Sequence, residues 1–308
     1  MTRAVVFAYH NVGYRCLSVL LDQGVEVPLI LSHADNPKEN IWFHSVSELA
    51  EKYGIPLITP EDPNTPEVRK RIQELQPDFF FSFYYRNMLS QELLQIPKRG
   101  SLNMHGSLLP KYRGRVPVNW AILHGEKETG ASLHYMELKP DSGALVDQQA
   151  VPILLEDTAL EVFHKVTWAA ELVLNRSLPR LLAGSAPGAP LDLKQGRYFG
   201  GRRAEDGRID WSLSALQVHN LIRAVAPPYP GAFSDLVEKP IRFLRSQFTR
   251  ENSHFPELSP CLYCEAGKFY VDCRDGVRLR ILALEIYQRP CSPETFLATF
   301  GHPPCKLL

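Results

Sequence analysis

The sequence predicts an α/β protein with a Rossmann-like, doubly wound and mostly parallel sheet, followed by a smaller β-barrel-like domain. Three observations lead to this fold class. Strands alternate with helices over the first half of the chain. The expected strand at residues 25–32 is apolar almost throughout, as in a sheet buried on both faces. The length of 308 residues is too great for one ordinary core. We place the boundary between residues 1–203 and 204–308.

The N-terminal elements are marked by familiar helix signals. Gly24 ends the first helix, Ser45 and Glu48 form a capping box, and Pro66 stands at the first position of a helix. Strands are expected at residues 5–9, 25–32, 55–58, 79–84 and 101–104, and helices at 14–22, 45–54, from 65 and at 90–94. This alternation is what predicts the parallel sheet.

The second half of the chain begins with two further strands and ends in a region of short strands with one helix. Strands are expected at 130–137 and 144–154, joined by a turn that contains Asp141, and a long helix runs from Thr158 to about residue 182. Residues 183–190 have the composition of a flexible linker. Beyond residue 203 we expect one helix at 214–225 and short strands at 232–234, 241–246, 261–265, 269–273 and 279–287.

Composition excludes several classes of protein. The formal net charge is zero, so a large nucleic-acid footprint is disfavoured and we expect no nucleic-acid partner. No signal-peptide pattern and no run of about 18 apolar residues occurs, so we expect a cytoplasmic chain without a membrane span. The six cysteines lack the density of a disulfide scaffold.

Two nucleotide-binding signatures and a clear metal site are missing. After the first strand, residues 8–13 hold one glycine instead of G-x-G-x-x-G, so a nicotinamide dinucleotide is disfavoured, and no P-loop occurs. Cys261 and Cys264 have metal-like spacing without a clean second pair. We interpret them as structural and predict no metal.

Asn103 and His105 are the first candidates for chemistry. Two residues apart on a strand, they share one face, and a glycine-bearing loop with Lys111 and Arg113 follows. Asp141 could join them, because strand ends and the loops beyond them converge at one edge of a parallel sheet. The alternative is that Asn103 and His105 are structural and bond to local backbone.

A histidine, a carboxylate and an amide together can support acyl transfer to an amine. The histidine moves a proton, the carboxylate stabilises its charged form, and the amide donates to an oxygen that gains charge. No serine or cysteine nucleophile motif is evident, which favours direct transfer.

The stretch 101–114, SLNMHGSLLPKYRG, together with Asp141 in 139–144, KPDSGA, resembles the folate-dependent formyltransferase family. The resemblance implies the formyltransferase fold with an OB-like C-terminal domain, and N10-formyltetrahydrofolate as co-substrate without a metal. It implies that His105 is the general acid/base, that Asn103 holds the formyl oxygen, and that Asp141 raises the pKa of His105. The folate contacts that it implies are Asn87, Met88, Leu89, Arg115, Glu137, Leu138, Lys139 and Pro140.

A closer resemblance, over most of the chain, is to the formyltransferase domains of polymyxin-resistance enzymes. It rests on residues 6–13, 33–37, 81–86 and 199–203. Those domains formylate UDP-4-amino-4-deoxy-L-arabinose for lipid A modification and are fused to a decarboxylating dehydrogenase. This chain ends at Leu308, so we expect separate enzymes to supply the amino sugar. Substrate contacts are expected at Tyr9, Lys111, Arg113, Arg202 and Arg203; a homodimer is one arrangement to test.

Three alternatives remain open at this point. A methionyl-tRNA formyltransferase would share the three residues and the two-domain plan, although the neutral charge argues against it. A formyltetrahydrofolate hydrolase would release formate without an acceptor. A binding module for folate or nucleotide would carry out no chemistry.

Overall fold

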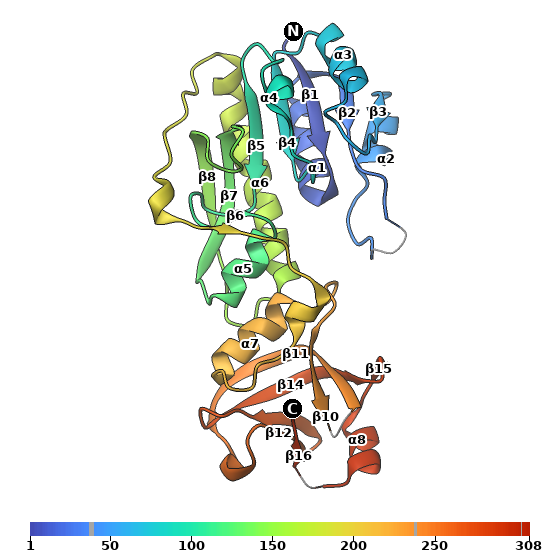
Figure 1. Ribbon diagram of the computed structural model, residues 1–308, viewed down its shortest axis with the longest axis vertical. Coiled ribbons are helices and arrows are strands. Elements are labelled where there is room, and N and C mark those ends of the chain that lie inside the picture. Colours follow the sequence, from blue (N-terminus) through green and yellow to red (C-terminus); the bar gives the residue numbers. More distant parts are fainter. Residues whose placement is uncertain (37–39, 237–238, 303) are drawn as a thin grey trace. The chain divides into compact units, whose positions relative to one another are not determined.

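The computed structural model describes residues 1–36, 40–236, 239–302 and 304–308 (Figure 1). Pro37, the last residue of the motif at 33–37, lies outside the described residues. The chain divides into two compact units. Unit 1 comprises residues 1–117, 129–151 and 164–200, and unit 2 comprises 118–128, 152–163 and 201–308. Unit 2 therefore contains residues 118–128 and 152–163 in addition to residues 201–308, which begin near the predicted domain boundary.

Unit 1 is built on a seven-stranded sheet with the strand order β3-β2-β1-β4-β5-β7-β8. The order of β2, β1 and β4 follows the doubly wound plan, with parallel pairing from β3 through to β5. The strands are β1 (Arg3–Ala8), β2 (Glu26–Leu31), β3 (Leu57–Ile58), β4 (Phe79–Phe83), β5 (Ser101–His105), β7 (Glu128–Tyr135) and β8 (Leu145–Pro152). The predicted α/β fold class is confirmed.

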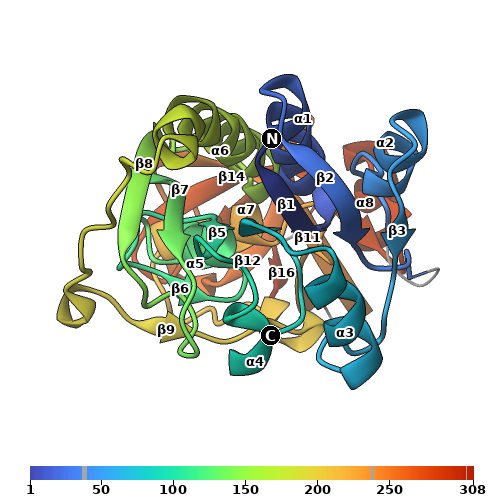
Figure 2. The same cartoon turned by 90° about the horizontal axis from the view of Figure 1, so that it is seen from above.

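Helices cover both faces of this sheet (Figure 2). One face carries α1 (His10–Asp22), α2 (Val46–Lys52) and the long α6 (Ala159–Leu182), and the other carries α3 (Pro66–Glu74) and α4 (Gln91–Leu94). On the second face, Ile72 of α3 and Leu93 of α4 pack with Phe7 and Phe80 of the sheet. Since each face is sealed by apolar packing, the central strands are buried throughout, as their continuous apolar sequence predicts.

One strand runs against the others. β7 pairs with β5 in the antiparallel sense, so that Leu102 lies opposite Tyr135 and His105 lies opposite Ser132. The sequence predicts a mostly parallel sheet and leaves this direction open. Because β7 runs in this direction, the segment that follows it starts beside the first residues of β5 and then runs toward the C-terminal end of β5.

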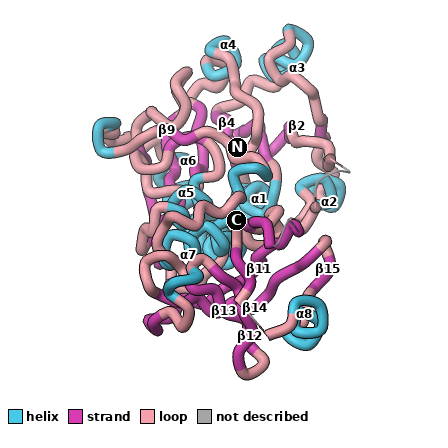
Figure 3. The backbone as a smooth tube through the Cα atoms, turned by 60° about the horizontal axis from the view of Figure 1, so that its bottom comes forward, coloured by secondary structure: helices cyan, strands magenta, loops and turns pink. Residues whose placement is uncertain are grey.

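A short ribbon lies outside the sheet. β6 (Arg113–Gly114) pairs in parallel with β9 (Tyr198–Phe199). β9 lies at the end of the segment that begins with the predicted linker at residues 183–190. Figure 1 shows this segment in yellow, passing beside β8 and then turning in toward β6. Apart from a turn of 3-10 helix (Leu193–Gln195) and β9, Figure 3 draws it as loop. We call residues 192–199 the strap.

Unit 2 contains a strongly curved antiparallel sheet that nearly closes into a barrel. Its strand order is β10-β11-β14-β13-β12-β16, and a bridge between Leu236 and Leu307 joins the chain end to β10. The strands are β10 (Ala232–Leu236), β11 (Lys239–Asn252), β12 (Cys261–Glu265), β13 (Lys268–Asp272), β14 (Val277–Ile286), β15 (Arg289–Pro290) and β16 (Cys305–Lys306). The predicted small barrel is confirmed, although β11 is far longer than the expected 241–246.

The helices of unit 2 are α5 (Pro117–Leu123), α7 (Ala215–Ala224) and α8 (Pro293–Phe300), of which α5 begins with a residue of unit 1. α7 and α8 pack apolar residues onto the barrel, including Ile222 and Phe296. α8 is not among the elements predicted from the sequence. The side chain of Ser292 caps this short helix by accepting a hydrogen bond from the backbone N–H of Thr295. Among the described residues, no helix is long and apolar enough to span a membrane.

His219 of α7 gives unit 2 a predicted pH dependence. It is fully buried, with Nδ1 2.8 Å from Ser246 Oγ and Nε2 2.8 Å from the Leu155 carbonyl oxygen. Burial, aided by Arg223, lowers the pKa of His219 to about 4 from 6.5, despite the Leu155 carbonyl. The neutral ring therefore contributes stability that is full above pH 6.5 and is lost as the pH falls toward 4.

We expect this loss to reach about 3 kcal/mol of the free energy of unfolding. Urea denaturation of the wild type and of His219→Gln at a series of pH values from 7.5 to 4 measures it. The variant should show a smaller decrease over this range, whereas His302→Gln, at an exposed position, should follow the wild type. If the free energy of unfolding of His219→Gln decreased with falling pH as steeply as that of the wild type, His219 would not be the source of this pH dependence.

Candidate active site

The site lies on the face of the sheet that carries α3 and α4. Asn103 pairs with Ser82 of β4, and Ser82 shares its face with Phe80, which packs under these helices. His105 lies two residues further along β5 and faces the same way. The side of β5 next to β7 adds His134, directly opposite Asn103.

Asp141 reaches this face because β7 is antiparallel to β5. The turn after β7 begins level with Leu102 and brings Asp141 back over Asn103 and His105. Its backbone has φ of 51°, a left-handed conformation that aspartate tolerates better than most residues. The predicted proximity of Asn103, His105 and Asp141 is therefore found, but through a returning turn and not through a common edge of parallel strands.

One carboxylate oxygen is the centre of the site. Asp141 Oδ1 lies 3.5 Å from Asn103 Nδ2, from His105 Nδ1 and from His134 Nε2. Asp141 Oδ2 accepts a hydrogen bond of 2.8 Å from the backbone N–H of Gly114. At 3.5 Å the three contacts to Oδ1 are longer than ordinary hydrogen bonds.

His105 has its ring orientation set from both sides. Nε2 lies 2.8 Å from the carbonyl oxygen of Tyr112. A carbonyl only accepts, so Nε2 carries a proton, and Nδ1, toward Asp141, is the nitrogen that can take up another. The protonated ring would then donate to the Tyr112 carbonyl on one side and to the Asp141 carboxylate on the other. This arrangement suits a group that accepts a proton during a reaction.

His134 determines which way the Asn103 amide points. His134 Nδ1 lies 2.7 Å from the Tyr135 carbonyl oxygen and must be its donor, so Nε2 of the neutral ring is an acceptor. The Asn103 Nδ2 group, 3.2 Å away, donates to it. His134 is not among the site residues that the sequence predicts. Its spacing to Asn103 carries no signal, because the pairing depends on the unpredicted direction of β7.

Replacing His134 with leucine should reduce turnover without preventing folding. Leucine fills a similar space but removes the acceptor, which frees the Asn103 amide to rotate. We expect kcat to decrease about 10-fold, because small errors in the placement of a donor are costly in catalysis. Steady-state kinetics would measure it, with His302→Leu as the control; unchanged kcat in His134→Leu would contradict the assigned role.

The surroundings of Asp141 keep it ionised. Burial alone would raise its pKa, but the positive charge that the imidazoles of His105 and His134 can carry, together with a hydrogen bond from the Gly114 N–H, outweighs burial and holds the pKa of Asp141 well below its usual range. A buried carboxylate that stays charged among two imidazoles is a characteristic of functional sites.

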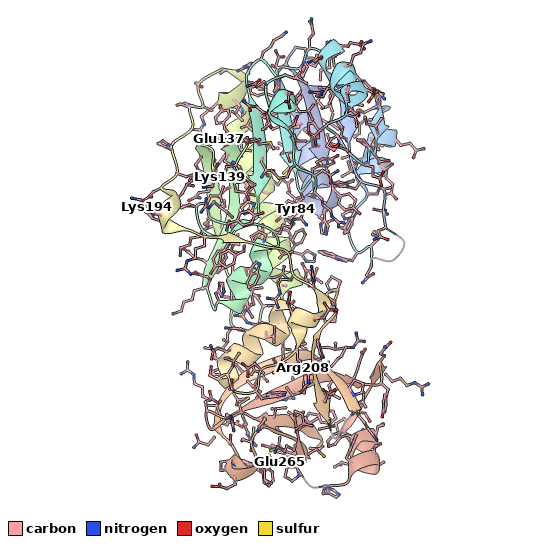
Figure 4. All side chains as sticks on the ribbon, in the orientation of Figure 1. Tyr84, Glu137, Lys139, Lys194, Arg208 and Glu265 are labelled. Carbon is pink, nitrogen blue, oxygen red and sulfur yellow. The ribbon has the colours of Figure 1, made fainter. Side chains whose placement is uncertain are left out.

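The positions predicted for folate lie on three loops beside this face. Leu89 belongs to the core cluster under α3 and α4, whereas Met88 exposes 54% of its surface and Leu138 63%. Asn87 donates to the Glu61 carbonyl oxygen. Glu137 and Lys139, labelled in Figure 4, are exposed on the turn before Asp141, with Pro140 half-buried. Arg115 has an exposed side chain, and its N–H donates to the Phe199 carbonyl oxygen.

The positions predicted for the acceptor are dispersed. Lys111 is exposed, whereas Arg113 is only 7% exposed and donates from Nη2 to the Gly196 carbonyl oxygen at 3.3 Å. Arg202 and Arg203 belong to unit 2. There Arg202 stacks its guanidinium 4.8 Å from the centre of the Trp120 ring.

Tyr9 is buried and lines a cavity of about 200 Å³ at the carboxyl ends of β1, β2 and β3. Its hydroxyl donates to Asp35 Oδ1 at 2.8 Å. The other polar walls include Ser32, His33, Ser45 and Thr59. A cavity lined by hydroxyls and one carboxylate is suited to a polyhydroxylated ligand.

No cluster of three or more His, Cys, Asp or Glu side chains with the geometry of a metal site occurs within residues 1–36, 40–236, 239–302 and 304–308. The cysteines in this part of the chain are free thiols. Burial raises the pKa of Cys261 to about 12 and that of Cys264 above its ordinary value.

Comparisons with known proteins identify the family of both parts of the chain. Residues 17–178 match a family model described as "Formyl transferase", and residues 202–301 match "Formyl transferase, C-terminal domain". An N-formyltransferase from Helicobacter canadensis, in complex with folinic acid and dTDP-3-aminofucose, superposes with a TM-score of 0.75 at 20% identity, over 93% of this chain and 100% of that one.

Two further solved structures share the fold. WlaRD, a sugar 3-N-formyltransferase in the presence of dTDP and 5-N-formyl-THF, gives a TM-score of 0.72 at 18% identity, covering 94% of this chain and 99% of its own. The methionyl-tRNA formyltransferase from Clostridium thermocellum gives 0.58 at 16% identity, covering 93% and 99%.

Proposed function

Because the chain belongs to the formyl transferase family, we propose that it transfers a formyl group from N10-formyltetrahydrofolate to the amine of a nucleotide-linked amino sugar. The observation that carries this proposal is the convergence of Asn103, His105 and His134 on one oxygen of Asp141. Formyl transfer to an amine needs a donor for an oxygen that gains charge and a base for the proton that the amine loses.

His105 is the group that takes this proton, and it can return the proton to N10 of the folate when the bond between N10 and the formyl carbon breaks and tetrahydrofolate leaves. Its Nδ1 is the available position, and the charge that the ring gains there is offset by the ionised Asp141. Asn103 keeps one amide hydrogen on His134, and its contact of 3.5 Å to Asp141 is long enough to give way. The second amide hydrogen can then serve the formyl oxygen.

The folate would lie against the loops that follow β4 and β7. The exposed side chains of Met88 and Leu138 offer apolar surface, and the surrounding turn offers backbone groups, a combination that fits a flat heterocycle. When bound, the folate supplies the activated formyl group. Solved relatives with folinic acid or 5-N-formyl-THF support the choice of co-substrate.

The acceptor is proposed to be a nucleotide sugar, and UDP-4-amino-4-deoxy-L-arabinose is the first candidate. Two relatives in complexes with dTDP or a dTDP-sugar support the class. The neutral chain also lacks the basic surplus that a tRNA would favour. The cavity beside Tyr9, with Asp35 and several hydroxyls, is a suitable place for part of such a ligand.

The deciding experiment is incubation of the purified chain with N10-formyltetrahydrofolate and a panel of UDP- and dTDP-linked amino sugars. Mass spectrometry should show the gain of one formyl group on a member of the panel. Parallel reactions with charged initiator tRNA and with no acceptor test the two rival activities. Formylated tRNA, or release of formate at a similar rate without acceptor, would replace the proposal.

A further inference from the structure

The loop that follows β5 supplies two backbone groups to the active site. The carbonyl of Tyr112 accepts from His105 Nε2, and the N–H of Gly114 donates to Asp141 Oδ2, each at 2.8 Å. Both groups must be held to a fraction of an ångström if they are to orient His105 and Asp141. What fixes this loop therefore bears on the chemistry without contacting the reacting atoms.

On its inner side the loop is attached to β7. The buried hydroxyl of Ser132 donates to the Ser107 carbonyl oxygen at 2.6 Å and accepts from the Leu109 N–H at 3.1 Å. These bonds hold the start of the loop. The Ser107 hydroxyl extends this support by donating to the Lys111 carbonyl oxygen at 2.6 Å and to that of Tyr112 at 3.4 Å, whereas none of these bonds reaches Gly114.

On its outer side the loop is held by the strap. The N–H groups of Arg113 and Arg115 donate to the carbonyl oxygens of Arg197 and Phe199, at 3.1 and 2.9 Å. The ring of Phe199 stacks on that of Tyr112, with 5.2 Å between centroids and 23° between planes. Every one of these contacts is within three residues of Tyr112 or Gly114.

Arg113 adds a buried attachment. Its side chain is 7% exposed, and Nη2 donates to the Gly196 carbonyl oxygen. A guanidinium buried in this way cannot reach solvent or a bulky ligand without displacing the strap. We therefore interpret Arg113 as part of the contact between strap and loop.

Two glycines show how closely strap and loop approach. A Cβ at Gly196 would lie 1.8 Å from the Pro110 carbonyl oxygen, and one at Gly114 would lie 2.2 Å from the Phe199 carbonyl oxygen. The backbone of Gly196 is extended, with φ of −149°, which alanine adopts freely. Only the close approach of the Pro110 and Lys111 backbone thus requires glycine there.

From these contacts we propose that the strap, residues 192–199, is a positioning element for the active site, with Gly196 and Phe199 as its positioning residues. It acts by fixing Tyr112 and Gly114, and through them His105 and Asp141. This inference rests on the proposed function for its kinetic consequences, but its effect on Asp141 can be measured separately. Most of the strap is exposed, and Lys194 projects outward in Figure 4, so the strap adds little to the core.

The test compares Gly196→Ala with the matched control Gly200→Ala. A Cβ at Gly200 meets no atom within 4 Å, so this change should leave kcat unaltered. Gly196→Ala should lower kcat about 10- to 100-fold with KM within about threefold, since it displaces the loop by a fraction of an ångström or more. Its Tm should stay within about 3 °C of the wild type.

A second readout does not depend on activity. Carbon NMR of the aspartate carboxyls, assigned with Asp141→Asn, should show Asp141 titrating at higher pH in Gly196→Ala, because the Gly114 N–H bond that lowers its pKa is disturbed. Phe199→Ala should act in the same direction without a steric clash, and Phe199→Tyr should restore most of the rate.

The outcomes separate this inference from the proposed function. If the wild type formylates no acceptor but Asp141 shifts as described, the strap positions the site and the function is wrong. If both Gly196→Ala and Phe199→Ala match Gly200→Ala in kcat and in the Asp141 titration, the positioning role is overturned. A lower kcat that accompanies a large loss of Tm and an unmoved Asp141 would also overturn it, as that is a purely structural effect.

Discussion

Replacing His105 with alanine is expected to lower kcat for formyl transfer by about 10²–10⁴-fold. The change removes the nitrogen that faces Asp141 and can take up the proton of the amine. The fold should persist, because the ring contributes one hydrogen bond to Tyr112 and lies on a face closed by loops, outside the cluster of residues packed under α3 and α4. Steady-state kinetics with the best acceptor of the panel measures the effect.

The control for His105→Ala is His302→Ala, at an exposed position in unit 2. It should retain wild-type kinetics. Added imidazole should restore part of the lost rate to His105→Ala and to no other variant, since it can enter the vacated space and accept a proton. Near-normal turnover of His105→Ala without imidazole would show that another group moves the proton.

Much of the fold was predictable because the signals are local. The apolar runs of β1, β2 and β4 and the caps at Ser45, Thr65 and Ser90 mark the elements that alternate in a doubly wound sheet. Asn103 and His105 were identifiable for the same reason, as two residues apart on one strand always share a face.

The rest of the site depends on contacts between distant segments. The direction of β7 decides that His134 lies beside Asn103 and that Asp141 returns to His105, and strand direction leaves little trace in a single sequence. β9 has two residues, too few for any periodic pattern, so the sequence does not predict its pairing with β6. Gly196 likewise resembles any loop glycine until the carbonyl of Pro110 is seen beside it.

Arg113 illustrates how burial changes an interpretation. In the sequence it is one of three basic residues in a loop, and contact with substrate phosphates is a natural expectation. The structure gives it a buried side chain directed to the Gly196 carbonyl, whereas Lys111 and Arg115 stay exposed. Contact with a ligand therefore remains a proposal for the exposed Lys111 and Arg115, whereas the burial of Arg113 argues against such a contact.

Asp141→Asn should have the second large effect, a decrease in kcat of about 10²–10⁴-fold with the geometry largely retained. Asparagine keeps the shape but removes the charge that offsets protonated His105. An equivalent change beside the catalytic histidine of a serine protease costs about 10⁴-fold. Asparagine presents its amide nitrogen either to His105 or to the Gly114 N–H, and in the second placement the hydrogen bond from Gly114 is lost.

The stability of Asp141→Asn provides an independent check. Since the folded-state pKa of Asp141 is held below its ordinary 3.8, the carboxylate stabilises the fold fully above that pH, and this contribution is lost as the pH falls through the lower folded value. The difference in free energy of unfolding between wild type and variant should thus be constant from pH 5 to 7 and shrink in stronger acid. A difference that instead grew on acidification would mean that Asp141 is not ionised in the fold.

The double variant His105→Ala/Asp141→Asn tests whether the two residues act as one unit. If Asp141 works by stabilising charge on His105, removing it from an enzyme that already lacks the histidine should cost almost nothing further, because residues of one catalytic unit are strongly non-additive. The double variant should therefore turn over within a few-fold of His105→Ala. If the two losses multiplied instead, Asp141 would have a role of its own, such as holding the amine or Asn103, and the coupling argued from the 3.5 Å contact would be wrong.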